Sequence, residues 1–165
     1  MRTFLLGLGA ALIVGAPSAF ADDAPSYVLM GVSGVQAAVF VDTSTLQHRS
    51  QLVTAWELTV FSQPTEIGGR LASYTLNQEE FDCDRKTDRV VYLSGFGDND
   101  ELLLGASTSG TAAEPEIPES LSAVERQFVC GGSQPMPKVP ASPSRHDAIK
   151  LAHDLLSEMA RESAH

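Results

Sequence analysis

The sequence lacks the recurring motifs by which many enzyme families are identified. It contains no P-loop and no GxGxxG, and the string nearest to a GxSxG nucleophile elbow, Gly31-Val32-Ser33-Gly34, does not have the required spacing. Glu79 and Glu80 are adjacent, so in a strand they would point to opposite faces and could not work as a paired acid and base. We therefore predict that the protein is not an enzyme.

Metal-ligand patterns are also scarce. Asp98-Asn99-Asp100-Glu101 clusters oxygen ligands but lacks the spacing of an EF-hand loop, so we interpret it as a solvated hairpin tip. His146 and His153 lie seven residues apart on an expected helix, where two imidazoles without a third ligand make a poor metal site. We predict no metal and no cofactor.

Positive charge is sparse, and long apolar segments are missing after the N-terminus. The chain has 11 Lys and Arg residues against 21 Asp and Glu residues. So acidic a surface repels phosphate, which argues against nucleic acid and anionic lipid as partners. No later segment approaches the roughly 20 apolar residues that a membrane span needs.

The N-terminus has the pattern of a cleavable export signal. A basic start at Arg2 precedes an apolar run over residues 4–14 and the small-x-small sequence Ala19-Phe20-Ala21. The run is too short to span a membrane, and Asp22 stands where a lipid anchor would need a cysteine. We expect cleavage after Ala21 and a soluble exported protein, with the periplasm as the expected location and secretion or surface display as the alternatives. Loss of Arg2 leaves 10 basic against 21 acidic side chains, a formal net charge of −11.

Two cysteines, Cys83 and Cys130, are the only ones in the chain. In an oxidising compartment such a pair most often forms one bridge, which stabilises by about 4 kcal/mol in the chain-entropy model. The alternatives are a redox pair, metal ligands, or thiols that link two chains. The sequence shows neither CxxC spacing nor two further zinc ligands.

Alternating patterns predict an antiparallel sheet of five or six strands. The clearest runs from Leu52 to Ser62, where Trp56, Leu58 and Val60 share one face and Ala55, Glu57 and Thr59 share the other. We expect a turn over residues 64–69 and a hairpin tip over residues 95–100. The other strands are expected at residues 27–30, 35–42, 70–77, 89–94 and 101–106.

Two helices are expected after the strands. The first covers residues 119–128, with Leu121, Val124 and Phe128 on its apolar stripe, and it should fray before Cys130 so that this residue can reach Cys83. A stiff linker with four prolines leads to a second helix from residue 145, with Ser144 as a candidate N-cap. This second helix could dock on the sheet, pair with another protomer, or stay loose.

Three aromatic residues are candidates for binding: Trp56, Tyr74 and Tyr92. On a patterned strand a large ring most often fills the core, whereas an exposed Trp or Tyr is a favoured interface anchor. Both interpretations stay open from the sequence.

The chain resembles the surface-adhesin protein E family of small exported bacterial domains. The resemblance rests on the order of Trp56, Tyr74, Phe81-Asp82-Cys83, the basic Arg85 and Arg89, Tyr92, the Pro118-x-Ser120 helix entry and Val129-Cys130. The resemblance covers roughly residues 39–131. It implies an α+β fold, in which a six-stranded antiparallel sheet carries one helix tethered by a Cys83–Cys130 disulfide. It also implies non-enzymatic attachment to host matrix proteins, often by dimeric, surface-displayed members. The chain departs from the family in lacking a lipobox and in adding the linker and the last helix.

These observations predict four segments: a signal peptide (1–21), an adhesin-E-like domain (22–131), a Pro-rich linker (132–144) and a C-terminal helix (145–165). The leading hypothesis is an exported binding module that holds a protein or a small apolar ligand through its sheet, with a homodimer as a further option. The alternative is a periplasmic envelope structural or stress-associated protein that acts through its C-terminal helix.

Overall fold

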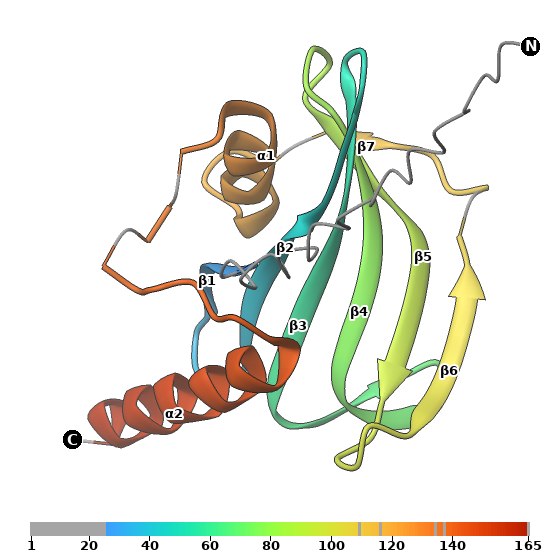
Figure 1. Ribbon diagram of the computed structural model, residues 1–165. Coiled ribbons are helices and arrows are strands. Elements are labelled where there is room, and N and C mark those ends of the chain that lie inside the picture. Colours follow the sequence, from blue (N-terminus) through green and yellow to red (C-terminus); the bar gives the residue numbers. More distant parts are fainter. Residues whose placement is uncertain (1–25, 109, 116, 134, 137, 165) are drawn as a thin grey trace, which may run out of the picture.

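The computed structural model describes residues 26–164 apart from 109, 116, 134 and 137 (Figure 1). The expected signal peptide therefore lies outside the described residues. Within the described part of the chain, neither helix is both long and apolar enough to cross a membrane.

The centre of the molecule is an antiparallel sheet in which six strands follow one another in chain order, and a short seventh strand pairs with the fifth. The predicted α+β fold, with its disulfide-tethered helix, is confirmed. The strands are β1 (Tyr27–Ser33), β2 (Ala37–Arg49), β3 (Leu52–Ile67), β4 (Arg70–Asp82), β5 (Thr87–Phe96), β6 (Leu102–Ser107) and β7 (Glu114–Pro115).

The β3–β4 hairpin is longer than the sequence predicts. β3 continues through Pro64 to Ile67, so the turn expected over residues 64–69 shrinks to Gly68 and Gly69, both with positive φ. Proline has no amide hydrogen for the ladder. It is tolerated here because the β3–β4 pairing is irregular between Val60 and Thr65.

Helix α1 (Leu121–Gly131) follows the expected entry at Ser120, whose side chain accepts a hydrogen bond from the Ala123 amide. The expectation that the helix frays before Cys130 is wrong. The helix continues until Gly132 ends it in the left-handed conformation, and Cys130 reaches Cys83 from within the last turn. The Cα atoms of the two cysteines are 5.7 Å apart.

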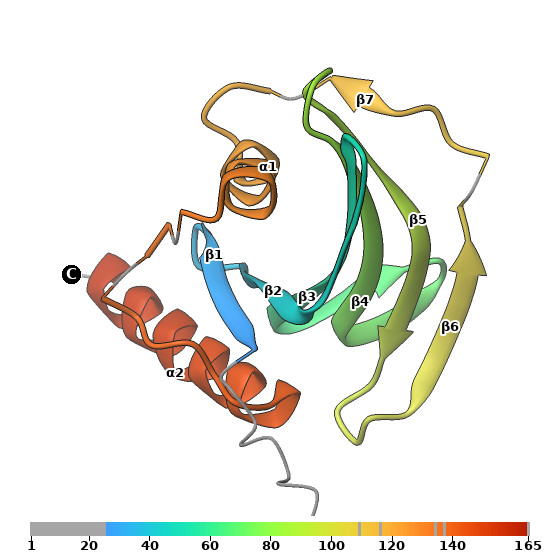
Figure 2. The ribbon, with the colours of Figure 1, turned by 45° about the horizontal axis from the view of Figure 1, so that its top comes forward.

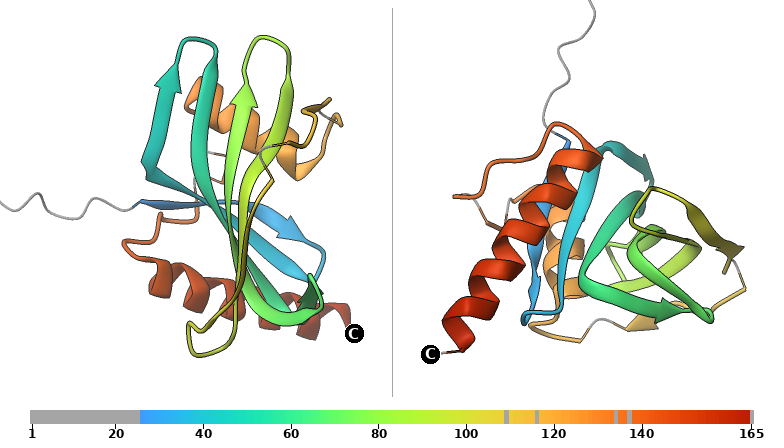
Figure 3. Two further views of the ribbon diagram at one scale, coloured as in Figure 1. Left: turned by 90° about the vertical axis from the view of Figure 1, so that its right-hand side faces the viewer. Right: turned by 90° about the horizontal axis from the view of Figure 1, so that it is seen from below.

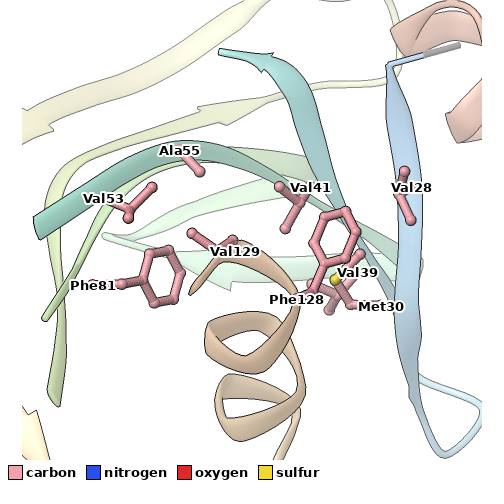
Figure 4. Packing of buried hydrophobic residues seen from close by; sticks show 9 residues of the cluster. All are labelled: Val28, Met30, Val39, Val41, Val53, Ala55, Phe81, Phe128 and Val129. Carbon is pink, nitrogen blue, oxygen red and sulfur yellow. The ribbon is translucent and has the colours of Figure 1, made fainter. Parts of the chain in front are cut away.

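One face of the sheet, which we call the α1 face, packs against α1 (Figure 4). Gly31 allows the Leu121 side chain to lie directly on β1, since a Cβ there would come within 2.5 Å of it. Side chains that alternate along β1 to β4 meet Phe128 and Val129 of the helix. The buried residues of this cluster are Val28, Met30, Val39, Val41, Val53, Ala55, Phe81, Phe128 and Val129.

The opposite face, the α2 face, packs against helix α2 (Arg145–Ser163) at the β1–β3 side (Figure 2). Ser144 is the N-cap, as predicted, and accepts a hydrogen bond from the Asp147 amide. Of the three arrangements considered for this helix, docking on the sheet is the one observed. The buried residues of this second cluster are Leu29, Ala38, Phe40, Leu58, Val60, Tyr74, Ala148, Ala152 and Leu156.

The segment between the helices returns the chain to the edge of β1 (Figure 3). The Tyr27 amide donates to the Ser142 carbonyl, and the Ser142 amide donates back to the Tyr27 carbonyl. This bridge covers the start of β1 and positions Ser144 to begin α2. The proline-containing segment is therefore joined to the sheet just before the helix starts.

Candidate binding face

Trp56 and Tyr92 lie in one row across the middle of the sheet, on the α2 face. Trp56 pairs with Gln78 of β4, and Gln78 pairs with Tyr92 of β5. The two rings meet edge to face with centroids 6.0 Å apart, the geometry that aromatic quadrupoles favour. Both residues are partly buried, so each leaves part of its ring accessible on a rigid strand.

Tyr92 also extends over β6. A Cβ at Gly105 would lie 2.6 Å from the Tyr92 hydroxyl oxygen, so only glycine leaves room for the phenol ring over this strand. The ring of Tyr92 thus connects the surface of β5 to the edge strand. The two rings therefore meet above the Gln78 position of β4, and the Tyr92 ring continues over Gly105 of β6.

A charged pair borders the aromatic rings in the next row of the same face. Arg89 Nη2 lies 2.6 Å from Glu80 Oε1, and its Nε donates to the same oxygen over 2.9 Å. Both side chains remain partly exposed, at 33 % and 22 %. Aromatic rings beside an accessible guanidinium are the residue types that dominate the energy of protein–protein contacts. We refer to Trp56, Gln78, Tyr92, Glu80 and Arg89 as the aromatic face.

Tyr74, the third candidate from the sequence, is not part of this surface. It is 3 % exposed and stacks on Phe96 with ring centroids 4.9 Å apart. Its hydroxyl donates to Asp100 Oδ1 over 2.7 Å. Burial raises the pKa of Tyr74, and the hydrogen bond to Asp100 raises it further. Its position makes Tyr74 part of the cluster that packs against α2.

The hairpin tip between β5 and β6 meets the start of α2. Asp100 lies 3.9 Å from Arg145, whose guanidinium also lies over the Tyr74 ring at 5.6 Å. The tip and the helix together line a hollow of about 380 Å³, which includes His146 and His153. Two features that the sequence showed separately, the acidic tip and the histidine pair, are thus brought to one place. The Arg145–Asp100 pair joins the start of the helix to the hairpin tip.

Three buried carboxylates form a cluster that sequence reasoning missed. Glu57, Glu79 and Glu125 offer one oxygen each, all within 4.8 Å of one another, between the sheet and α1. Alternation along β3 places Glu57 on the same face as Ala55, and α1 covers that face. Glu79 and Glu80 point to opposite faces of the sheet, as expected, and the Glu79 side chain lies on the face that α1 covers. The signal available in the sequence was Glu125, a glutamate next to the apolar stripe of α1.

The sequence matches the family model described as "Surface-adhesin protein E" over residues 27–131, more than half of the chain. No curated protein matches the sequence significantly. Two crystal structures of Haemophilus influenzae protein E are similar in fold. One, crystal form II, has 13 % identity and a TM-score of 0.48 and covers 76 % of this chain and 98 % of its own. The other has 14 % identity and a TM-score of 0.45, with coverages of 74 % and 92 %.

These TM-scores are too low to carry functional detail, so the assignment depends on the sequence match and on the agreement of its residues with the sheet, α1 and the disulfide. The match begins at the first residue of β1 and ends at the last residue of α1. Helix α2 lies beyond it. The chain belongs to the surface-adhesin protein E family.

Proposed function

We propose that this protein is an exported, non-enzymatic binding module that attaches to host extracellular matrix proteins through its aromatic face. The family supplies the class of function, a surface adhesin. The observation that supports the location is the edge-to-face pair of Trp56 and Tyr92, partly exposed beside the Arg89–Glu80 pair. Such anchors on rigid strands bind at a low entropic cost because their side chains are already held.

The shape of the aromatic face favours a protein over a small apolar ligand. Small ligands occupy concave pockets that bury most of their surface. The hollow of about 600 Å³ near the end of β3 is lined by other residues, among them Ser33, Gln36 and Gln63. The aromatic rings cross the strands on the surface of the sheet, which suits a broad protein contact.

Helix α2 is less suited to be the contact site. Its buried residues, Ala148, Ala152 and Leu156, already pack on the sheet, and Ile149 and Leu155 lie partly buried beside them. The apolar side of the helix is therefore occupied within the molecule. This arrangement favours a structural role for α2 over the recruitment of an envelope partner.

Pairing of two copies would use β6, the last strand in the main order of the sheet. Within the described residues its outer edge has no neighbouring strand, and Leu102 is 59 % exposed. Such an apolar edge is a template for a second strand. Multi-angle light scattering of wild type and Leu102→Lys tests this: a dimer that the lysine converts to a monomer supports it, and a wild-type monomer at high concentration contradicts it.

The binding proposal is tested by surface plasmon resonance against a panel of purified matrix glycoproteins. Trp56→Ala and Tyr92→Ala should each weaken binding about 30-fold, the effect of removing an interface anchor worth about 2 kcal/mol. Leu71→Ala is the matched control because Leu71 is apolar and 65 % exposed but lies elsewhere on β4. Thermal unfolding checks that each variant is folded. Unchanged binding by both aromatic variants would refute the aromatic face as the contact site.

A further inference from the structure

The carboxylate cluster beneath α1 is built from residues of three elements. Glu57 lies on β3, Glu79 on β4 and Glu125 on α1, and their exposed fractions are 8 %, 7 % and 3 %. Because water is almost excluded, three negative charges at this separation would repel one another strongly. The cluster therefore requires neutralisation by protons or by a cation.

The hydrogen bonds around the cluster are unequally distributed. Glu57 Oε1 accepts from the Thr59 hydroxyl over 2.5 Å and from Asn77 Nδ2 over 3.2 Å. Among the described residues, by contrast, no donor reaches Glu125 Oε1 or Asn77 Oδ1, which are both buried, and the Glu125 carboxyl meets only another carboxyl, that of Glu57. Buried acceptors without a donor are costly and rare. Two such oxygens, both beside the acidic cluster, indicate a binding site for a cation that takes oxygen ligands.

We propose that Glu57, Glu79 and Glu125 bind a hard divalent cation of the size of Ca²⁺ or Mn²⁺, which links α1 to the sheet. Oxygens bound to one calcium ion at 2.3–2.6 Å are at most about 5 Å apart, and the three glutamate oxygens already meet this limit at 4.8 Å. The donors are all carboxylate oxygens, a set that favours such ions over zinc or copper. Rotation of the Asn77 amide by 180° would direct its unpartnered Oδ1 toward the Glu57 side as a fourth oxygen ligand.

Without the cation, protons perform the same neutralisation. Burial raises the pKa of both Glu79 and Glu125 well above the usual value, and the nearby Glu57 and Asp88 carboxylates raise them further. A divalent cation would neutralise the same three carboxylates directly, because it brings positive charge between them.

A hollow lies next to the strand position that pairs with Glu79. Val90, the register partner of Glu79, lines this hollow of about 250 Å³ together with two acidic side chains, Asp88 and Glu114, and the basic Arg89. Asp88 also accepts a hydrogen bond from Ser122 of α1 over 2.8 Å, so it sits where the helix meets β5.

The test compares the folded, disulfide-bonded protein after chelation with the same protein given Ca²⁺, Mn²⁺ or Mg²⁺. At about 100 times the dissociation constant, Ca²⁺ or Mn²⁺ should raise the unfolding temperature by roughly 5–10 °C. Isothermal titration of Ca²⁺ into the chelated protein should show saturable binding.

Two sets of variants separate the cluster from other acidic groups. Glu79→Gln/Glu125→Gln keeps the shape of the two side chains and removes their charge, so it should fold but lose the cation response. Glu80→Gln, the adjacent carboxylate on the other face, should respond like wild type. The proposal is overturned if millimolar Ca²⁺ and Mn²⁺ leave the unfolding temperature of wild type unchanged, or if the double variant responds as wild type does.

Discussion

The two faces of the sheet are covered in different ways. On the α2 face, alanines of the helix and sheet allow close apolar packing, and the aromatic face remains partly open beyond the helix. On the α1 face, a disulfide fixes a short helix over an apolar cluster that borders three buried carboxylates. The α1 face is therefore stabilised within the molecule, whereas the part of the α2 face beyond the helix is the part that we propose for contact.

The largest effect should come from removing the disulfide that holds the α1 face. Cys83 and Cys130 are separated by 47 residues in sequence, and Cys83→Ser/Cys130→Ser should lower the free energy of unfolding by about 4 kcal/mol. Hydrogen exchange should show α1 losing protection while α2 keeps most of its own. Equal loss in both helices would show that the two faces unfold as one unit and would end the comparison.

The next largest effect should come from the α2 face. Leu156 is 2 % exposed, and Leu156→Ala should cost about 3 kcal/mol through lost burial and the cavity left behind. Leu155→Ala is the control because Leu155 is only partly buried. Urea denaturation measures both. A cost for Leu156→Ala below that of the control would mean that α2 contributes little to the core.

The carboxylate cluster should make stability depend on pH when divalent cations are chelated. Glu79 and Glu125 have pKa values raised above the usual 4.5 by burial and by the neighbouring Glu57. Stability from their protonated forms is fully present below pH 4.5 and is lost as pH rises through their higher folded values. Glu79→Gln/Glu125→Gln should therefore match wild type near pH 4.5 and exceed it at pH 8 by about 1–3 kcal/mol.

Chemical denaturation at the two pH values measures this difference. Glu80→Gln should follow wild type at both, because its carboxylate pairs with Arg89 on the other face. A double variant that is less stable than wild type at pH 8 would contradict the account of the cluster.

The smallest effects should come from the helix caps, which allow a direct comparison of the two helices. Ser120→Ala and Ser144→Ala each remove an acceptor for an amide of the first turn, Ala123 and Asp147 respectively. Each should cost about 1 kcal/mol. Thermal unfolding measures both, and a cost near zero at one cap would show that its helix begins without this hydrogen bond.

The sequence predicts the fold well where local pattern and tertiary packing agree. Alternation identifies the strands, and Ser120 and Ser144 mark where the helices begin. It fails where tertiary contacts override local preference: β3 extends past Pro64 because its ladder is irregular there, and α1 extends past Cys130 because Gly132 ends it.

The candidate sites are predicted less completely. Trp56 and Tyr92 are recognisable as aromatic strand residues, but only the cross-strand register brings them together, and the same register buries Tyr74. Glu57, Glu79 and Glu125 are far apart in sequence and belong to three elements. Their meeting depends on how α1 crosses the sheet, which the periodicity of each element alone does not determine.

The most direct test of the aromatic face uses the single tryptophan of the chain. Incorporation of 5-fluorotryptophan places one ¹⁹F resonance at Trp56, which can be followed while an unlabelled matrix glycoprotein is added. The account predicts that this resonance shifts or broadens in step with binding and that Tyr92→Ala suppresses the change. Saturating binding with an unchanged Trp56 resonance would contradict it.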